Sequence, residues 1–286
     1  MRYLDPKNDL TFKKFFGEHP HLLKSFLNAV MPLAEGKKIV SLEYLPAELV
    51  PEIPIFKNSI VDVSCLDEKG QQFIVEMQML WTDSFKSRVL FNASKAYIKQ
   101  VGRGIQYKGL QPVYSLNIIN EDFDNKPDTY IHHYQIIHTQ FSEKVMEGLE
   151  FVFIELPKFK AKKFTDKKLQ VLWLRFLSEI NDQQESISPD FLEVPELKEA
   201  SELIIESGFT KGELETYDKY WDYISTEKTI RADSFDSGME QGMEQGIEQG
   251  IGQEKLNIAK HLKTIGISSA VISEATGLSE QEIEKL

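Results

Sequence analysis

The chain has 286 residues and a mass of 33.0 kDa, which exceeds one average domain and predicts a main domain with a smaller appendage. Hydrophobic residues make up 41% of it, enough to bury a core, and its net charge of −12 argues against a protein that coats nucleic acid. The single cysteine, Cys65, excludes a disulfide framework, and since no segment resembles a signal peptide or a membrane span we expect a cytoplasmic protein without a membrane partner.

Two short helices begin the predicted fold, and strands dominate after them. Asn8 or Asp9 can cap a first helix that ends near Phe16, and Pro20 can begin a second that ends near Val30. Predicted strands cover residues 39–45, 59–66, 72–80, 113–119, 130–137 and 150–156, and predicted helices cover residues 84–101 and 166–180. This order of elements predicts an α/β core with a mixed sheet.

Residues 59–80, SIVDVSCLDEKGQQFIVEMQML, predict a hairpin with one acidic residue at the same level on each strand. A three-residue loop that ends at Gly70 sets the register, because glycine tolerates the left-handed conformation that this loop requires. In that register Asp62 stands directly opposite Glu76, with Cβ atoms ~5 Å apart, and both strands place apolar residues on the opposite face.

Two carboxylates opposite each other repel unless a positive charge lies between them. A hard divalent cation such as Mg²⁺ prefers carboxylate oxygens and water, and it can activate water for attack on a phosphodiester. Gln78 shares the face of Glu76 and could reach the water or the phosphate, whereas Met77 can offer only its backbone carbonyl. The alternative is a solvated sheet face with two outward acids, but that face is half apolar, which favours a partly covered cleft.

The predicted helix over residues 84–101 follows the Glu76 strand and has a basic side. That side carries Arg88, Asn92, Lys95 and Lys99. Since no acidic residue occurs between Ser84 and Asn120, this side is suited to DNA phosphates, the alternative being an ordinary solvated helix face.

Two other sets of polar residues have simpler explanations than metal binding. Asp9 is a further possible metal ligand near the cleft, although a role as helix N-cap already accounts for it. His132, His133 and His138 lie on one predicted strand, where neighbouring side chains point to opposite faces, so we do not expect them to share a metal.

Six segments of the chain carry a family resemblance. They are Asp5–Gly17 (DPKNDLTFKKFFG), residues 59–63 around Asp62, residues 73–78 with Glu76 and Gln78, Arg88–Tyr107, Pro112–Ile119 and Phe153–Phe159. Together, over roughly residues 5–160, the segments resemble the PD-(D/E)XK nuclease-type transposases, also called recombination-promoting nucleases.

The resemblance implies a restriction-endonuclease-like αβββαβ core and Mg²⁺-dependent cleavage of DNA, with Asp62 as the first acid and Glu76 as the second. One position departs from the pattern, because the wider superfamily usually has lysine where this chain has Gln78. Glutamine carries no positive charge to stabilise the transition state, so Arg88 or Lys95 would have to supply it.

The tail contains a four-residue repeat of the form Gly-(Met/Ile)-Glu-Gln that begins at Gly238. It is either a flexible linker or a helix whose glycines let a second helix approach closely, and we expect the helix pair, between two subunits. Beyond it, residues 256–265, 268–276 and 279–285 predict three short helices, the last with a capping box of Ser279 and Glu282. They resemble a helix-turn-helix but lack the basic side chains of a DNA reader, so a packing module is expected.

We therefore expect four segments and a homodimer that cleaves DNA. Residues 1–160 form a PD-(D/E)XK nuclease-like catalytic domain, 161–231 a helical support region, 232–254 a repeat helix or linker, and 255–286 a small helical module. The expected function is a DNA endonuclease that uses Mg²⁺ or Mn²⁺, linked by resemblance to recombination or mobile elements. The alternatives are a degenerate nuclease fold that binds DNA or a protein without cutting, and a purely structural oligomer.

Overall fold

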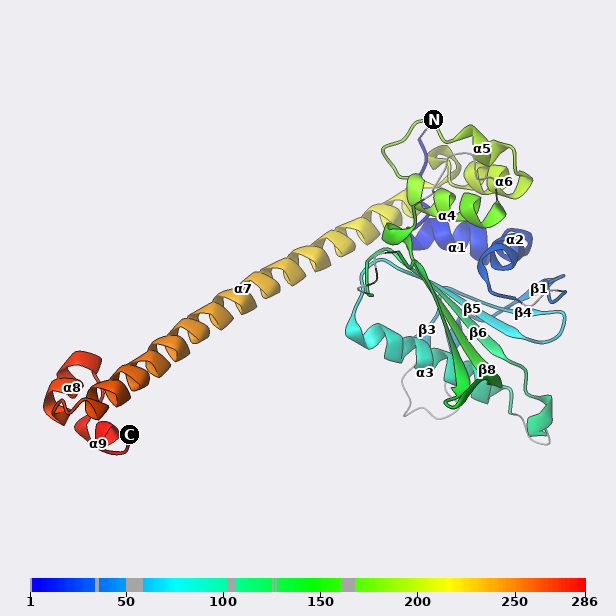
Figure 1. The fold of residues 1–286 in the computed structure, drawn as a ribbon. Helices are drawn as coiled ribbons and strands as arrows, with labels where there is room; N and C mark the ends of the chain where they lie inside the picture. The colour runs from blue at the N-terminus through cyan, green and yellow to red at the C-terminus, as the bar shows by residue number, and fades with distance from the viewer. Residues whose placement is uncertain are drawn as a thin grey trace. The chain divides into compact units, whose positions relative to one another are not determined.

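The structure is a computed structural model that describes residues 2–33, 36–49, 59–101, 106–124, 126, 128–160 and 168–286. The chain divides into two compact units, Met1–Ile224 and Ser225–Leu286. The first unit contains the sheet and the helices that cover it (Figure 1). Among the described residues, no helix is both long enough and apolar enough to cross a membrane.

A six-stranded sheet forms the centre of the first unit. In spatial order its strands are β1 (Leu42–Leu45), β4 (Val63–Asp67), β5 (Gln72–Gln78), β6 (Val113–Ile119), β8 (Phe141–Glu155) and β7 (Ile131–His138). Strands β5, β6 and β8 are parallel and the other pairs are antiparallel, so the sheet is mixed as expected. Strands β2 (Glu48–Leu49) and β3 (Ser59–Ile60) form a separate small pair.

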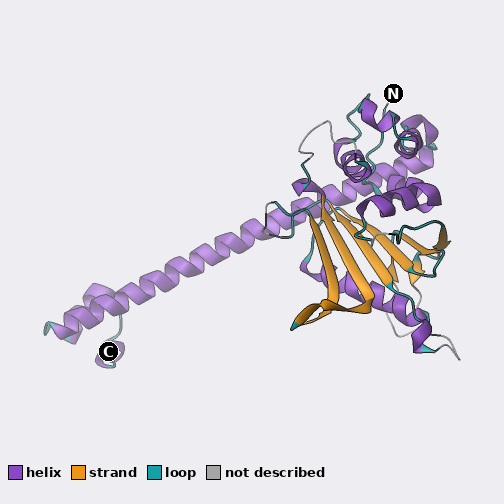
Figure 2. Cartoon of the chain, turned by 45° about the vertical axis from the view of Figure 1, so that its right-hand side comes forward, coloured by secondary structure: helices purple, strands orange, loops and turns teal. Residues whose placement is uncertain are grey.

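Helices cover both faces of this sheet (Figure 2). One face is covered by α1 (Asp9–Gly17), α2 (Pro20–Val30) and α4 (Leu169–Glu179), on which α5 (Pro189–Leu192) and α6 (Pro195–Leu203) pack in turn, and the other face packs against α3 (Asp83–Lys99). Three single-turn helices are η1 (Tyr107–Gly109), η2 (Leu156–Lys158) and η3 (Glu206–Gly208). Helix α3 also joins the parallel strands β5 and β6, which need a crossover connection of this kind.

The N-terminal helices form as their sequence predicts. Asn8 caps α1, because its side-chain oxygen accepts a hydrogen bond from the Leu10 N–H at 3.0 Å, and Pro20 occupies the first position of α2. The aromatic ring of Phe16 stacks on Phe26 and contacts Trp173, which joins α1 and α2 to α4 in the main core. The start of α1 is therefore fixed both by its cap and by its packing.

The acidic hairpin has the predicted register. Gly70 adopts a φ of 78°, and the β4–β5 ladder pairs Val63 with Val75 and continues in that register to the turn. One residue departs from strand alternation: in a regular strand Val61 would share the face of Val63, but it packs with Ile74 against α3. The reason is a bend at residue 62, which interrupts the strand and with it the alternation of faces.

Two elements are longer than the sequence predicts. Strand β8 begins at Phe141 rather than at residue 150, and it pairs with β7 in a hairpin whose tip is exposed on both faces. Because neither face of that tip is buried, its sequence has no apolar alternation to reveal a strand. Helix α7 (Lys211–Thr264) is continuous through the glycine repeat, with its first turns in the first unit, where Tyr217 is buried.

The second unit holds the rest of α7 together with α8 (Ser269–Thr276) and α9 (Glu280–Glu284). Ala259, Ile272 and Ile283 form its small core. Gly277 ends α8 in the left-handed conformation, and the predicted capping box at the start of α9 is present.

Candidate active site

The two acids of the hairpin lie side by side, although only one of them is on a strand. Glu76 is on β5, on the face covered by α3, and is 5% exposed. Asp62 lies in the bend before β4, and its Oδ2 accepts a hydrogen bond of 2.7 Å from the Met77 N–H. This bond holds the Asp62 carboxylate against the residue that follows Glu76.

Burial makes it costly to keep both carboxylates charged. It raises the pKa of Asp62 to about 7, against the effects of the Met77 N–H and Lys13, and the charges of Glu76 and Asp9 raise that pKa further. Burial also raises the pKa of Glu76, and Asn92 and Arg88 oppose that rise. A divalent cation between the two carboxylates would remove this cost.

The Met77 carbonyl is available on the same side as Asp62. In a strand the N–H and C=O of one residue point to the same edge, and the Met77 N–H points to Asp62. The next carbonyl, that of Gln78, points the opposite way, to β6, where it accepts a hydrogen bond of 2.9 Å from the Asn120 N–H. Asp62, Glu76 and the Met77 carbonyl would offer only oxygen ligands, which are the kind that Mg²⁺ and Mn²⁺ prefer.

Asn92 belongs to this site and not to the exposed basic side of α3 where the sequence analysis placed it. It is 1% exposed, because its spacing from Val89 and Ala96 puts it in the buried stripe of the helix. Its Nδ2 donates to Glu76 Oε1 at 3.1 Å, while its own Oδ1 has no hydrogen-bond partner among the described residues. A buried acceptor without a partner costs stability, so it marks a place for a donor such as water.

Arg88 of α3 brings a positive charge to the site. Gln78 stands at the position on β5 where the wider superfamily usually has lysine. The Arg88 Nη2 donates to Gln78 Oε1 at 2.6 Å and lies 3.6 Å from Glu76 Oε2. Gln78 is itself held, because its Nε2 donates to the Leu80 carbonyl at 2.6 Å. Gln78 therefore positions the Arg88 guanidinium beside the second acid.

Asp9 lies on the rim of the acid pair. The Lys13 Nζ is 2.7 Å from Asp9 Oδ1 and 4.0 Å from Asp62 Oδ1, so one ammonium group joins the two carboxylates. The N-cap of α1 is Asn8 and not Asp9, so capping does not account for Asp9. Its ion pair with Lys13 does.

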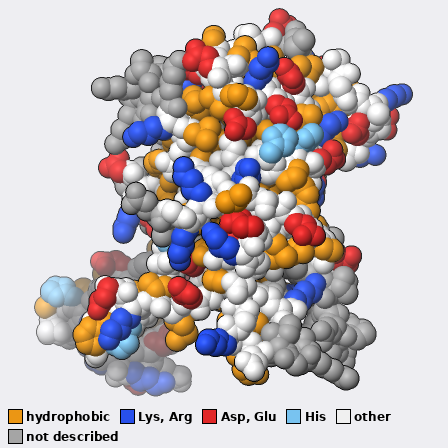
Figure 3. All heavy atoms as spheres, turned by 90° about the vertical axis from the view of Figure 1, so that its right-hand side faces the viewer, with side chains coloured by type: hydrophobic (Ala, Val, Ile, Leu, Met, Phe, Trp, Pro, Cys, Tyr) orange, Lys and Arg blue, Asp and Glu red, His pale blue; other side chains and the backbone are white. Residues whose placement is uncertain are grey.

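The other basic residues of the predicted DNA-contacting side, Lys95 and Lys99, lie on later turns of α3 than Arg88. Lys99 is exposed and Lys95 is partly exposed, with its Nζ 5.3 Å from the centre of the Phe91 ring. On the face drawn in Figure 3, lysine and arginine side chains alternate with acidic and hydrophobic ones.

The histidines of β7 make separate contacts. His132 Nε2 lies 2.7 Å from Glu155 and His133 Nε2 lies 2.9 Å from Glu150, so they share no ligand position, as their alternation predicts. Sequence reasoning missed another group, in which the ligand atoms of His19, His21 and Glu199 lie within 4.8 Å of one another. The spacing of the two histidines was its visible signal.

That group has a structural explanation. His21 Nε2 lies 2.8 Å from one oxygen of Glu199 and His19 Nδ1 lies 3.8 Å from the other, which ties the start of α2 to α6. All three side chains are partly or largely open to solvent. The acid pair beneath α3 is the more enclosed site.

Comparison with known families agrees with this arrangement. The sequence matches the family described as PD-(D/E)XK nuclease family transposase over residues 6–231, which extends the likeness through α4–α6 to the first part of α7. Comparisons with curated proteins and with solved structures gave no match. The mixed sheet, with α1 before it and α3 between β5 and β6, agrees with the restriction-endonuclease-like fold expected for that family. Because the match covers most of the chain, the protein belongs to the PD-(D/E)XK nuclease family transposases, and its function is nuclease- or transposase-related.

Proposed function

We propose that the protein is a divalent-metal-dependent DNA endonuclease in which Asp62 and Glu76 hold Mg²⁺ or Mn²⁺. The observation that carries the proposal is the hydrogen bond from the Met77 N–H to Asp62, which holds the Asp62 carboxylate at the residue next to Glu76, whose charge raises the pKa of Asp62. Nucleases of this family generally use divalent metals, which supports a cation at this place. Asp9 would become a ligand only if Lys13 moved away from it.

Each residue around the acids has a role in this proposal. The metal, bound by Asp62, Glu76 and the Met77 carbonyl, would polarise the phosphodiester and lower the pKa of water. Asn92 orients Glu76 by donating a hydrogen bond from its Nδ2, and the Oδ1 of Asn92 can accept a hydrogen bond from a water molecule. Arg88, held by Gln78, neutralises the charge that develops on the phosphate.

The DNA-contacting residues follow from the same geometry. Arg88 reaches the acids, and Lys95 and Lys99 lie on later turns of α3, where they could contact neighbouring phosphates. Since these are phosphate contacts, they would position the strand without reading its sequence. A role in recombination or in mobile elements would use such sequence-tolerant cleavage.

The glycine repeat supports a homodimer. In the proposed division of the chain into four segments, the repeat occupies residues 232–254. Met239, Met243, Ile247 and Ile251 are each more than half exposed, and the positions of Gly238, Gly242, Gly246 and Gly250 have open space around them. A second copy of this helix would cover both stripes, because small residues let backbones approach closely. Two nuclease domains joined in this way could cut both strands of a duplex.

The alternative is a degenerate nuclease fold that binds DNA or a protein without cutting it. Gln78 favours that alternative, because it cannot supply the charge of the usual lysine. The discriminating experiment incubates supercoiled plasmid with the full-length protein in Mg²⁺, in Mn²⁺ and in EDTA. Nicked or linear plasmid with either metal and none in EDTA supports the endonuclease, whereas intact plasmid throughout, with DNA still bound, supports the alternative.

A further inference from the structure

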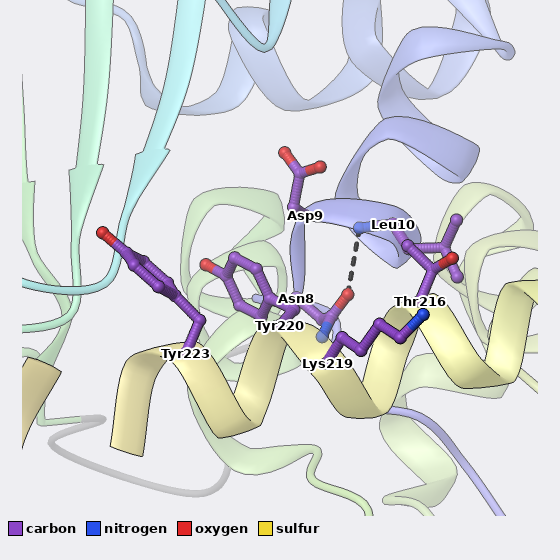
Figure 4. A pocket seen from close by; sticks show the side chains of 7 residues that line it. All are labelled: Asn8, Asp9, Leu10, Thr216, Lys219, Tyr220 and Tyr223. Atoms are coloured by element: carbon purple, nitrogen blue, oxygen red, sulfur yellow. Dashed lines mark hydrogen bonds between the residues drawn. The ribbon is translucent and has the colours of Figure 1, made fainter. Parts of the chain in front are cut away.

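An open pocket with a volume of about 270 Å³ lies in the first unit beside the acid pair. It lies between the N-terminal end of α1 and the first part of α7, and is lined by residues 8–10 and by Thr216, Lys219, Tyr220 and Tyr223 (Figure 4). None of the roles described above for the acids uses this pocket.

Hydrogen bonds fix the two walls of the pocket to each other. The Asn8 Nδ2 donates to the Tyr217 carbonyl at 3.2 Å, and the Tyr217 hydroxyl accepts from the Asp5 N–H at 2.9 Å. Tyr217 is 1% exposed and packs with Leu4. The pocket is therefore preformed, and a ligand would not have to order it.

The lining combines flat aromatic surface with a few polar groups. Tyr220 and Tyr223 are three residues apart on α7, so both rings belong to one side of the helix, and Figure 4 shows them next to each other. Tyr223 is 59% exposed, which leaves its ring open to a partner. Lys219 comes from the same helix, with its ammonium group beside Thr216 and directed away from the two rings, and Asp9 lies above Tyr220 (Figure 4).

Asp9 links the pocket to the acid pair. Asp9 lines the pocket and shares Lys13 with Asp62. Burial raises the pKa of the Tyr220 phenol, and the charges of Asp9 and Asp62 raise it further, so the hydroxyl stays protonated as a hydrogen-bond donor. A molecule that reaches from the acids into the pocket would therefore meet the Asp9 carboxylate as a hydrogen-bond acceptor, the Tyr220 hydroxyl as a donor, and the rings of Tyr220 and Tyr223.

We propose that this pocket holds one unpaired nucleobase of the DNA strand whose phosphate lies at Asp62 and Glu76, stacked on Tyr223. The inference rests on the proposed function and names its substrate class. Small-molecule sites usually exceed ~300 Å³, so a pocket of about 270 Å³ suits a single base and not a base pair. Aromatic rings stack on every base, Asp9 can accept from an exocyclic amino group, and Lys219 can contact the adjoining phosphate.

A base inside a duplex cannot enter such a pocket without leaving its stack. Unstacking and unpairing cost free energy, and the cost is smallest for a base that is already single-stranded or mismatched. The preferred substrates are therefore single strands, flaps, mismatches and other DNA with an unpaired nucleotide next to the scissile phosphate. This preference follows from the pocket and not from the metal.

The test measures stacking separately from cleavage. Full-length protein is titrated into a single-stranded oligonucleotide with one 2-aminopurine, with Ca²⁺ in place of Mg²⁺, and the fluorescence of that base is followed. We expect binding to quench it, because it stacks on an aromatic ring. Tyr223→Ala should remove most of the quenching and weaken binding about tenfold, whereas Tyr223→Trp should keep both.

Tyr107→Ala is the matched control. Tyr107 is 82% exposed and precedes the start of β6, whereas Glu76 lies near the other end of the parallel strand β5. Quenching equal to wild type in Tyr223→Ala, or an equal loss in Tyr107→Ala, would overturn the pocket proposal. Quenching that depends on Tyr223 in a protein that never cuts DNA would instead support the pocket and contradict the endonuclease.

Discussion

One backbone hydrogen bond places the first acid of the site. Asp62 lies in a bend, outside the ladder of β4 and β5, so strand pairing alone does not hold it opposite Glu76. The Met77 N–H does, at 2.7 Å from Asp62 Oδ2. An asparagine at position 62 could still accept this bond through its side-chain oxygen, which makes Asp62→Asn a test of charge with little change of geometry.

The metal-free protein should therefore gain stability from Asp62→Asn, and the gain should depend on pH. Burial raises the pKa of Asp62 from an ordinary 3.8 to about 7, so the folded state holds this proton more tightly than the unfolded state does. Stability is thus lost as pH rises from about 4 to about 7 and stays low above it. Denaturant unfolding in EDTA should show the variant more stable by roughly 1–3 kcal/mol at pH 8, and by less toward pH 4.

A gain of the same size at both pH values would show that the effect comes from packing and not from a buried charge. No gain at pH 8 would mean that the folded protein accommodates the ionised Asp62 without a metal. The Asp83→Asn variant, which changes an exposed acid at the start of α3, is the control.

Arg88 should supply the positive charge that Gln78 lacks. Arg88→Ala should lower the rate of cleavage by about 10²-fold or more, since it removes a charge that contacts both Gln78 and Glu76. Gln78→Ala should lower the rate less, because it only releases Arg88. Gln78→Lys should leave the rate intact or raise it, and in the Arg88→Ala background it should restore part of the lost activity.

The rescue distinguishes a charge at the phosphate from a purely structural contact. The two single variants and the double variant are compared by initial rates of plasmid cleavage at saturating Mg²⁺. If Gln78→Lys does not improve Arg88→Ala, the guanidinium is not the substitute for the missing lysine. Lys99→Ala, at an exposed position of the same helix, should weaken DNA binding and lower its salt dependence without changing the cleavage rate at saturating DNA.

Among the elements, the long helix α7 contributes to two functions along its length. Its first turns line the pocket beside the acids, whereas the glycine repeat lies in the second unit and carries the exposed apolar stripe. Each glycine in a helix costs roughly 1 kcal/mol relative to alanine, so a repeat of them is unfavourable in an isolated helix. Pairing with a second helix would compensate for that cost.

Replacing Met243 and Ile247 together by lysine should dissociate the proposed dimer. The two side chains are 65% and 57% exposed in the single chain. Each substitution would remove roughly 1.5–3 kcal/mol of the free energy gained by burying an apolar side chain at the interface. Light scattering coupled to gel filtration measures the mass of the full-length protein and of the variant. The control replaces Gln241 and Gln245 by lysine, which adds the same charge beside the stripe. Equal masses for all three proteins would leave the repeat as a monomeric helix.

For the whole molecule, the sequence was informative where the controlling interactions are local. The loop ending at Gly70 and the alternation of β5 set the hairpin register, and both are visible over a few residues. Burial of Asn92 was not visible, because a polar residue in the stripe of Val89 and Ala96 looks like part of the basic side until Glu76 is placed opposite it. Its spacing puts Asn92 in that buried stripe, and its contact with Glu76 gives it a role.

The pocket was out of reach for a different reason. Its two walls come from residues 8–10 and residues 216–223, and they meet only because α1 and the start of α7 pack together through Asn8 and Tyr217. Such long-range contacts leave no periodic signal in one sequence. The extended tip of β8 shows the same limit, since an exposed hairpin needs no apolar pattern.

The most direct test of whether Asp62 and Glu76 hold a metal that cuts DNA is the rate of plasmid cleavage by Glu76→Gln relative to wild type in Mg²⁺. The substitution keeps the shape of the side chain and its hydrogen bond with Asn92 but removes the charge of one proposed metal ligand. We expect cleavage by wild type and by Asp83→Asn, and a loss of at least about 10²-fold in Glu76→Gln. Cleavage by Glu76→Gln at the wild-type rate, or wild-type cleavage that persists in EDTA, would contradict this role of the two acids.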